Sequence, residues 1–346
     1  MKKKRVFAGL GCICLVLILV VTFVMPANAK PIELKLAHYS SHGHPMLEGI
    51  ARPWAKMVEE KTNGKVKITI YPAQTLVKMR DTYDAVVSGI ADIAWGLTLV
   101  TPGRFVLSNV ITIPFSPWTS SSELASQVVQ KLYEDGKVAK EWSEVKLLFM
   151  HTTPPSTIFS SKPVRSYEDA KKTRLITHLH TAEGVGLQKI GFIPVAVPTP
   201  EVYLSLQRGV ADATMLTWES CAGRKIYEVT KYAIDPHITT VPFYYIMNKK
   251  RWNSLPPDVK KAIDSLSGMW GSKFAGKRVD ASNEDAKHNF VGPKLKEIIK
   301  LSPGELKRWQ NAGEAAREWW IKYVEKKGKP GRKIYEEAVR ITNELK

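Results

Sequence analysis

The sequence predicts an α/β protein of two lobes, each a doubly wound sheet covered by helices, with a cleft between the lobes and a helical C-terminal region. Three observations predict this fold. The chain has 346 residues, more than one ordinary hydrophobic core holds. Apolar segments of period two alternate with segments of helical period, which favours mainly parallel sheets. One helix–Gly–strand unit also occurs twice along the chain.

The repeated unit has the pattern Tyr-x-x-apolar-x-x-Gly-apolar-Ala-Asp. It occurs at residues 83–92 and again at residues 203–212. Each copy predicts a helix ended by a glycine, Gly89 or Gly209, where a left-handed residue is favoured, and then a short apolar strand. Two such units imply two lobes. Ligands of open sheets bind beyond the carboxyl ends of the strands, so we expect the binding site in the cleft.

The elements before the first copy are predicted in order along the chain. Residues 32–36 alternate apolar and polar side chains and predict a strand. After a polar loop at 40–45, the helical spacing of the apolar residues predicts a helix over 46–61. Residues 66–72 predict a second strand, which ends at its proline and leads into the first copy.

The second half follows the same plan. A strand ending in proline at 193–198 precedes the second copy, and the apolar segment 239–247 predicts a buried strand. The prolines at 256–257 begin a helix that runs to Leu266. From about 268 to 346 the chain is predicted to be almost all helical. One apolar stripe in this region is expected to pack on the lobes: Trp309, Ala312, Ala316, Trp319, Trp320 and Tyr323.

These elements predict where the lobes divide. The first lobe is expected to contain residues 30–151 plus about 242–275. The second is expected to contain residues 152–241 plus about 276–346, with the C-terminal helices.

The first 29 residues predict a secretory signal peptide. Four basic residues at 2–5 precede an uncharged apolar run from Val6 to Met25, and 27–29 reads Ala-Asn-Ala, a small-x-small cleavage site. The run is also long enough for an uncleaved membrane anchor, which is the alternative. Cleavage would remove two of the three cysteines and leave Cys221, so no internal disulfide is possible.

The charge of the chain indicates an anionic partner. The sequence has 51 Lys and Arg against 33 Asp and Glu, a formal charge of +18, and +14 remains without the four basic residues of the leader. Basic and acidic residues are interleaved, as on solvated helix faces. No RNA-binding aromatic signature, zinc-finger spacing or basic leucine-zipper pattern is present, so we expect no nucleic-acid partner.

The motifs of common enzymes are absent from the sequence. There is no phosphate-binding Gly-x-x-x-x-Gly-Lys loop, no His-Glu-x-x-His, no Gly-x-Ser-x-Gly and no EF-hand loop. Cys221 has no local nucleophile signature. We therefore expect neither catalysis nor a cofactor.

Two His-x-His pairs, at 42–44 and 178–180, could together form a tetrahedral metal site. Their only neighbouring carboxylates are Glu48 and Glu183. We expect these histidines to be polar loop residues at the mouth of the cleft.

Arg174 is the strongest single candidate for ligand contact. It follows basic residues and leads into a short strand, and a guanidinium there can bind a carboxylate through two parallel hydrogen bonds. The alternative is a surface ion pair with Glu168 or Asp169. The sequence alone leaves both interpretations open.

A series of motifs makes a family resemblance specific. They are Asn-Gly-Lys-Val at 63–66, Tyr-Pro-Ala-Gln-Thr-Leu at 71–76, Gly-Ile-Ala-Asp at 89–92, Lys-Thr-Arg-Leu at 172–175, Gly-Phe-Ile-Pro-Val at 191–195, Pro-Glu-Val-Tyr at 200–203, and Met-Asn-Lys at 247–249 through Trp-Asn-Ser-Leu-Pro at 252–256. Together they cover most of residues 32–270. In this order they resemble the solute-binding proteins of TRAP transporters, the DctP family.

The resemblance implies a periplasmic-binding-protein fold and a receptor, not an enzyme. It implies two lobes that close on a small organic anion in the periplasm and deliver it to membrane permease subunits driven by a sodium gradient. Arg174, at the Lys-x-Arg position of the family, is then expected to bind the substrate carboxylate. Several members have a second arginine near 157–161, where this chain has Ile158 and Phe159.

Aromatic residues after the strand ends suggest the character of the pocket. Few charges lie among them, so a monocarboxylate with an apolar or aromatic body fits better than a dicarboxylate. The predicted substrate-binding residues besides Arg174 are His38, Tyr39, Trp95, Thr217, Trp218, Phe243 and Tyr244.

Two other functions stay open at this point. One is a secreted enzyme with His151, His178 or His180 as its base, oriented by Asp212 or Glu219. The other is a metal-ion carrier that uses the two His-x-His pairs.

Overall fold

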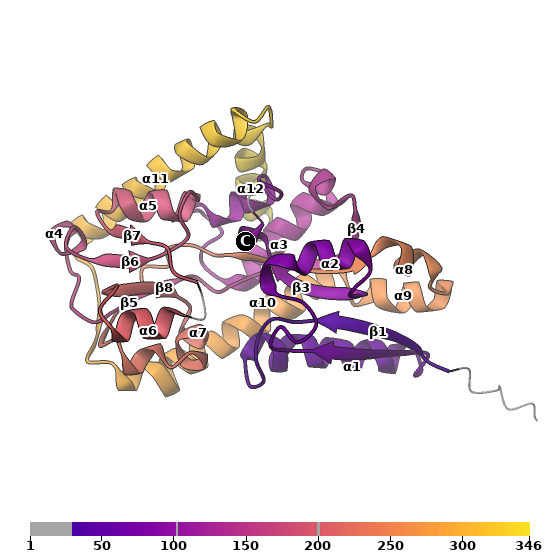
Figure 1. The fold of residues 1–346 in the computed structure, drawn as a ribbon. Coiled ribbons are helices and arrows are strands. Elements are labelled where there is room, and N and C mark those ends of the chain that lie inside the picture. The colour runs from indigo at the N-terminus through magenta and orange to yellow at the C-terminus, as the bar shows by residue number, and fades with distance from the viewer. Residues whose placement is uncertain (1–29, 102, 199–200) are drawn as a thin grey trace, which may run out of the picture. The chain divides into compact units, whose positions relative to one another are not determined.

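Two mixed sheets form the framework of the protein (Figure 1). The computed structural model describes residues 30–101, 103–198 and 201–346. The strands of the first sheet are, in spatial order, β2 (Val66–Tyr71), β1 (Ile32–Ala37), β3 (Ile93–Leu97), β10 (Pro242–Asn248) and β4 (Val145–Thr152). Those of the second sheet are β11 (Glu297–Ile299), β9 (Tyr232–Ile234), β5 (Thr157–Ser160), β8 (Ala213–Leu216), β6 (Arg174–Ile176) and β7 (Ile193–Val195).

The sheets are parallel except where the chain crosses between them. β1 runs parallel to β2 and β3, and β6 runs parallel to β7 and β8. β10 is antiparallel to β3 and β4, and β5 is antiparallel to β8 and β9. β4 of the first sheet leads directly into β5 of the second, and β9 of the second sheet leads directly into β10 of the first. β5 and β10 therefore run opposite to the other strands of their sheets. The expected alternation of strands and helices is confirmed, with these two antiparallel strands as an addition.

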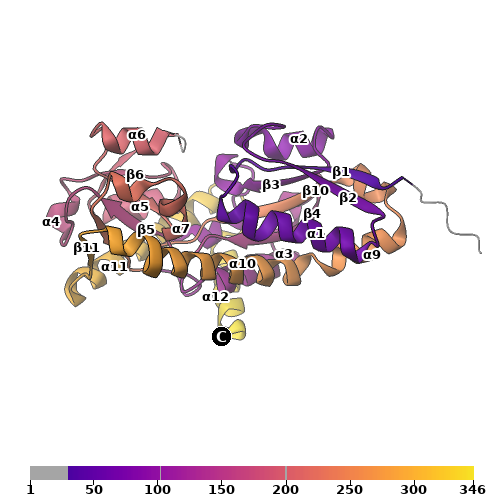
Figure 2. The same cartoon turned by 90° about the horizontal axis from the view of Figure 1, so that it is seen from below.

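Helices cover both faces of each sheet, as Figure 2 shows from a second side. They are α1 (Arg52–Lys61), α2 (Thr82–Ser88), α3 (Ser122–Glu134), α4 (Tyr167–Ala170), α5 (Ala182–Lys189), α6 (Val202–Gln207), α7 (Trp218–Gly223), α8 (Lys249–Ser254), α9 (Pro257–Ser265), α10 (Gly268–Asp285), α11 (Pro303–Glu325) and α12 (Gly331–Leu345). Short 3₁₀ or π segments lie at 46–51, 79–81, 98–100, 108–112, 139–142, 226–228, 286–291 and 292–294. The helix expected over 46–61 therefore begins as a π segment and continues as α1.

The repeated sequence unit is a repeated structural unit. α2 ends at Gly89, whose φ is 82°, and the second copy turns at Gly209, whose φ is 67°. Glycine adopts this left-handed conformation at no steric cost, which explains the residue at both positions. The helices lead into β3 and β8, which pair in parallel with β1 and β6.

The C-terminal region is helical with one interruption. The strand β11 and short helical turns separate α10 from α11, because residues 297–299 pair with β9. α10 packs against α3 and β4 of the first sheet and also against α7 of the second (Figure 2). α12 packs on α3 and shares its apolar core through residues such as Ile334 and Ile341. Residues 31–346 cluster as one compact unit, and the lobe bounds stay a prediction.

The predicted signal peptide, residues 1–29, lies outside the described residues. Cys221 is free and buried. Among the described residues, no helix combines the length and apolarity that crossing a bilayer requires.

Candidate functional site

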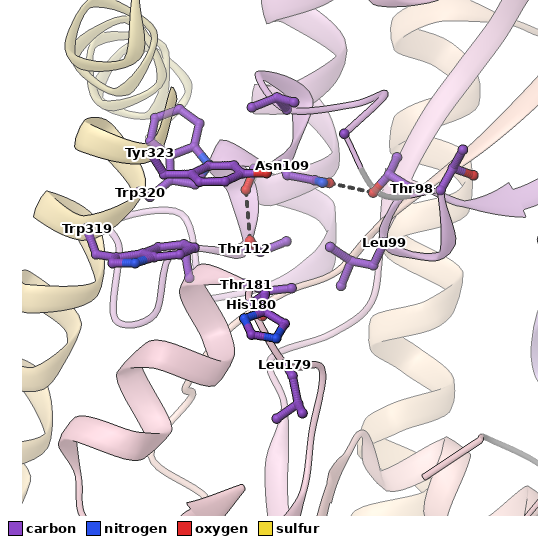
Figure 3. Close-up of a pocket in the computed structure, with 14 residues that line it drawn as sticks. Thr98, Leu99, Asn109, Thr112, Leu179, His180, Thr181, Trp319, Trp320 and Tyr323 are labelled. Carbon is purple, nitrogen blue, oxygen red and sulfur yellow. Dashed lines mark hydrogen bonds between the residues drawn. The ribbon is translucent and has the colours of Figure 1, made fainter. Parts of the chain in front are cut away.

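A pocket of about 220 Å³ lies where the segments after β3 and β6 meet α11 (Figure 3). The first sheet contributes the chain that follows β3, and the second contributes the turn between β6 and α5. The lining residues are Thr98, Leu99, Thr101, Gly103, Val106, Asn109, Thr112, Leu179, His180, Thr181, Ala182, Trp319, Trp320 and Tyr323. The pocket therefore lies beyond the carboxyl ends of one strand from each sheet, the usual place for ligands of open α/β sheets.

The walls of this pocket are mainly apolar. Trp319 and Tyr323 stack with ring centroids 5.2 Å apart and planes 8° apart. The Thr98 hydroxyl already has a hydrogen-bond partner, since it donates to Asn109 Oδ1 at 2.6 Å, as the dashed line in Figure 3 marks. No lysine, arginine or acidic residue is among the lining residues. Such walls fit the apolar body of a small ligand better than a second charged group.

Four of the predicted site residues lie together in an aromatic stack. The Trp95 ring stacks on His38 at 4.2 Å, on Tyr39 at 4.5 Å and on Phe243 at 4.7 Å between centroids. His38, Trp95 and Phe243 are buried, and Tyr39 is half-buried. Tyr39 packs on the same apolar core as the pocket residue Leu99. Tyr39 is thus the one partly exposed member of these four.

His151 holds Trp95 in place. Trp95 Nε1 donates to His151 Nε2 at 2.8 Å, and His151 Nδ1 lies 3.4 Å from the carbonyl oxygen of Thr152. Burial lowers the pKa of His151 to about 4. The ring is therefore neutral at neutral pH, and its Nε2 acts as an acceptor for Trp95.

The other predicted aromatic and polar residues are placed elsewhere. Tyr244 follows Phe243 on β10 and points to the opposite face, because side chains alternate along a strand; it packs edge-on against Tyr83. Trp218 is a core residue that donates from Nε1 to Asp235 Oδ2 at 3.1 Å. Thr217, just before α7, is buried, and its hydroxyl has no hydrogen-bond partner.

Arg174 lies at the amino end of β6, whereas the pocket lies beyond the carboxyl end of this strand. Its Nε and Nη2 atoms donate to Asp212 Oδ2 and Oδ1 at 3.0 and 3.1 Å. The side chain is 43% exposed. This geometry matches the surface ion pair that the sequence left open, but with Asp212 as the partner instead of Glu168 or Asp169. Binding of a ligand by Arg174 stays a prediction.

The arrangement of the histidines gives little support to a histidine-based enzyme or to a metal-ion carrier. Within the described part of the chain, no hydrogen bond joins His151, His178 or His180 to Asp212 or Glu219. His178 Nδ1 lies 3.2 Å from Glu183 Oε1 instead. Across the described ranges, no three His, Cys, Asp or Glu residues gather to hold a metal ion.

Sequence reasoning missed the contribution of α11 to the pocket. Trp319 and Tyr323 were expected in the apolar stripe that packs on the lobes. Trp309, Ala312, Ala316 and Trp320 are indeed buried, but Trp319 and Tyr323 are partly exposed and line the pocket. Their spacing of four residues could have indicated this, because it places the two rings side by side on one edge of the helix.

Several known proteins are similar to this chain over most of its length. The family model described as bacterial extracellular solute-binding protein, family 7 (DctP), matches residues 36–326. The outer membrane transporter protein TsaT of Comamonas testosteroni is 27% identical over 255 residues, 72% of this chain and 74% of that protein. The C4-dicarboxylate-binding periplasmic protein DctP of Rhodobacter capsulatus is 23% identical over 294 residues, 83% of this chain and 85% of that protein.

Solved structures have the same fold. A TRAP solute-binding protein from a marine metagenome, specific for aromatic acid ligands, is 28% identical, with a TM-score of 0.85 over 90% of this chain and 99% of that protein. A TRAP solute-binding protein of Rhodoferax ferrireducens is 23% identical, with a TM-score of 0.84 over 90% of this chain and 98% of that protein. Because the family model spans most of the chain, this protein belongs to the DctP family, the solute-binding proteins of TRAP transporters.

Proposed function

We propose that this protein is the periplasmic receptor of a TRAP transporter for a small organic acid, a monocarboxylate with an apolar or aromatic body. It releases this acid to membrane permease subunits. The leader predicted at residues 1–29 and the periplasmic DctP relative support this location.

The pocket of Figure 3 is the observation that carries the proposal. Both sheets and α11 contribute to it, so a bound ligand would link the two halves of the fold. Its volume of about 220 Å³ is below the range of roughly 300–1,000 Å³ for drug-sized ligands, which favours a single-ring compound.

The two 28%-identical structures of the metagenome protein support this ligand class. That protein is described in complex with metahydroxyphenylacetate and with 3-hydroxybenzoate, which are both aromatic monocarboxylates. The family as a whole also includes C4-dicarboxylate-binding members. The apolar walls of the pocket favour the first kind of ligand for this chain.

Thermal denaturation of the protein with a panel of acids tests the proposal. We expect 3-hydroxybenzoate or a related aromatic monocarboxylate to raise the midpoint and succinate to leave it unchanged. A ligand at 100 times its Kd stabilises the folded state by about 2.7 kcal/mol, so the shift is measurable. A panel in which no monocarboxylate raises the midpoint contradicts the proposal.

A pocket-filling variant locates the site. Leu179→Trp places a larger side chain in the pocket and should abolish the ligand-dependent shift. Leu204→Trp is the matched control, because Leu204 is an exposed leucine on α6 that does not line the pocket. If both variants keep the shift, the ligand binds elsewhere.

Delivery to the permease needs a separate measurement. In vesicles that contain the permease subunits, sodium-driven uptake of the identified acid should require this receptor. Uptake at the same rate without the receptor would contradict this part of the proposal.

A further inference from the structure

Arg224, the residue after α7, is a half-buried cation without a counter-ion among the described residues. Its Nε is buried and has no hydrogen-bond partner. The other described arginines that form no ion pair, Arg80, Arg208 and Arg278, are exposed. Removing a charged group from water without an opposite charge is costly, so this arginine is placed where an anion would be stabilised.

The loop after β1 lies near Arg224. The loop after β1 brings His44 close, since His44 Cδ2 lies 3.8 Å from the position that a Cβ of Gly223 would occupy. Burial, and next the positive charge of Arg224, lower the pKa of His44 to about 4. Tyr39, the partly exposed member of the aromatic stack, lies in the same loop, and burial raises its pKa while Arg224 opposes the rise. Neither side chain supplies a negative charge at neutral pH.

Glu219, the acidic residue of α7, does not pair with Arg224 either. Glu219 lies on α7 and is buried, and burial raises the pKa of its carboxyl group. Its Oε2 accepts the backbone N–H of Ser220 at 2.7 Å. It forms no ion pair with Arg224 in the described structure. His44 Nε2, in the loop after β1, is also buried without a partner.

We propose that Arg224 binds the carboxylate of the ligand, beside Tyr39 and outside the residues that line the pocket of Figure 3. The inference rests on the proposed function and names the cation that this function requires. A planar guanidinium can donate two parallel hydrogen bonds to a carboxylate, and the pair is stronger where water is excluded. The bound anion would also supply the missing counter-ion, whereas Arg174 already has Asp212.

Binding of an acid and of its uncharged amide tests this assignment. Isothermal titration would compare 3-hydroxybenzoate with 3-hydroxybenzamide on the wild-type protein, Arg224→Gln, Arg224→Lys and Arg208→Gln. Hydrogen bonds to charged groups contribute enough for a loss of roughly 10- to 100-fold in affinity for the acid in Arg224→Gln. Arg224→Lys keeps the positive charge but not the two parallel donors of the guanidinium, so it should lose less affinity for the acid. Arg208→Gln removes an exposed, unpaired arginine and should bind as the wild type does.

The amide distinguishes a direct contact from a general disturbance. Arg224→Gln should bind the amide as well as the wild type does, and its melting midpoint without ligand should not fall, because no folded-state partner is lost. If the wild type binds the acid and Arg224→Gln binds it equally well, the assignment is wrong while the proposed function stands. If Arg224→Gln loses acid and amide alike, or melts early, Arg224 is structural and the assignment is again overturned. If the wild type binds no acid of the panel, the proposed function itself fails.

Discussion

The carboxylate of Asp212 joins β8 to the amino end of β6 at Arg174. Asp212 Oδ2 accepts the backbone N–H of Arg174 at 2.9 Å, and the backbone N–H of Asp212 donates to the carbonyl oxygen of Arg174 at 2.9 Å. The first copy of the repeat contains the same link. Asp92 Oδ2 accepts the N–H of Lys35 at 2.8 Å, and Asp92 N–H donates to the Lys35 carbonyl at 3.1 Å. The aspartate of the repeat thus has an architectural role, and Arg174 is the counterpart of Lys35.

Removal of either aspartate side chain should therefore destabilise the fold. In Asp212→Ala and Asp92→Ala a partly buried backbone N–H loses its acceptor, which costs about 1 to 3 kcal/mol of unfolding free energy. Urea denaturation measures the loss. Asp258→Ala, which removes an exposed ion pair with Lys65, should change the free energy of unfolding much less. Equal stability of all three variants would contradict the architectural role.

The contribution of Asp212 should disappear in acid. Burial alone would raise the pKa of its carboxyl group, but the hydrogen bonds from Arg174 and Lys162 outweigh burial and lower the pKa to about 2. A carboxyl group with a depressed folded-state pKa stabilises the protein above the unfolded pKa of about 3.9 and loses that contribution as the pH falls toward 2. The stability difference between wild type and Asp212→Ala should therefore narrow between pH 5 and pH 2. A difference that is constant across this range would show that the charge of Asp212 is unimportant.

Arg174→Gln decides between the two roles of this residue. Because the guanidinium of Arg174 is 43% exposed, we expect the lost ion pair with Asp212 to lower the free energy of unfolding only slightly. We also expect the variant to keep the ligand-induced rise of the melting midpoint. Should the rise vanish while the variant stays folded, Arg174 binds the carboxylate, as the family resemblance implied.

Local patterns predicted the fold well because each depends on neighbouring residues. The Gly89 and Gly209 turns and the period-two strands could be predicted from the sequence. The direction of β10 and the strand β11 could not, because both depend on pairing between segments far apart in the chain. Whether Arg174 and Arg224 have acidic partners could not be predicted for the same reason. A sequence shows that an arginine is present, but only the fold shows whether an acidic residue already neutralises it.

His151 should make the protein less stable in mild acid. Because burial lowers its folded-state pKa to about 4, the unfolded chain takes up a proton below about pH 6.5 while the folded protein does not. Stability is therefore lost as the pH falls from 6.5 toward 4, by an amount on the order of 3 kcal/mol, and this histidine has no such effect above pH 6.5.

His151→Gln should remove this part of the pH dependence. The side-chain oxygen of glutamine can still accept the hydrogen bond from Trp95, so the variant should be close to wild type at pH 7.5. Relative to wild type, it should gain stability at pH 4.5 in urea denaturation. His288→Gln, at an exposed position, is the control and should follow the wild-type profile. If His151→Gln also follows that profile, the buried ring does not set the acid sensitivity.

Gly276 allows the backbones of α10 and α3 to approach each other. A Cβ at this position would lie 2.7 Å from Cα and 2.9 Å from the backbone nitrogen of Glu123, and Asp280 accepts the first N–H groups of α3 at 2.8 Å each. Gly276→Ala should cost about 1 to 3 kcal/mol, since backbone atoms must move, although alanine is the better helix former. Gly304→Ala in α11 meets no atom within 4 Å and should stabilise the protein by up to about 1 kcal/mol. Thermal unfolding of the two variants gives shifts of opposite sign if the contact is tight. A stabilised Gly276→Ala would mean that α10 and α3 can move apart without loss of stability. It would contradict the close backbone contact between these two helices.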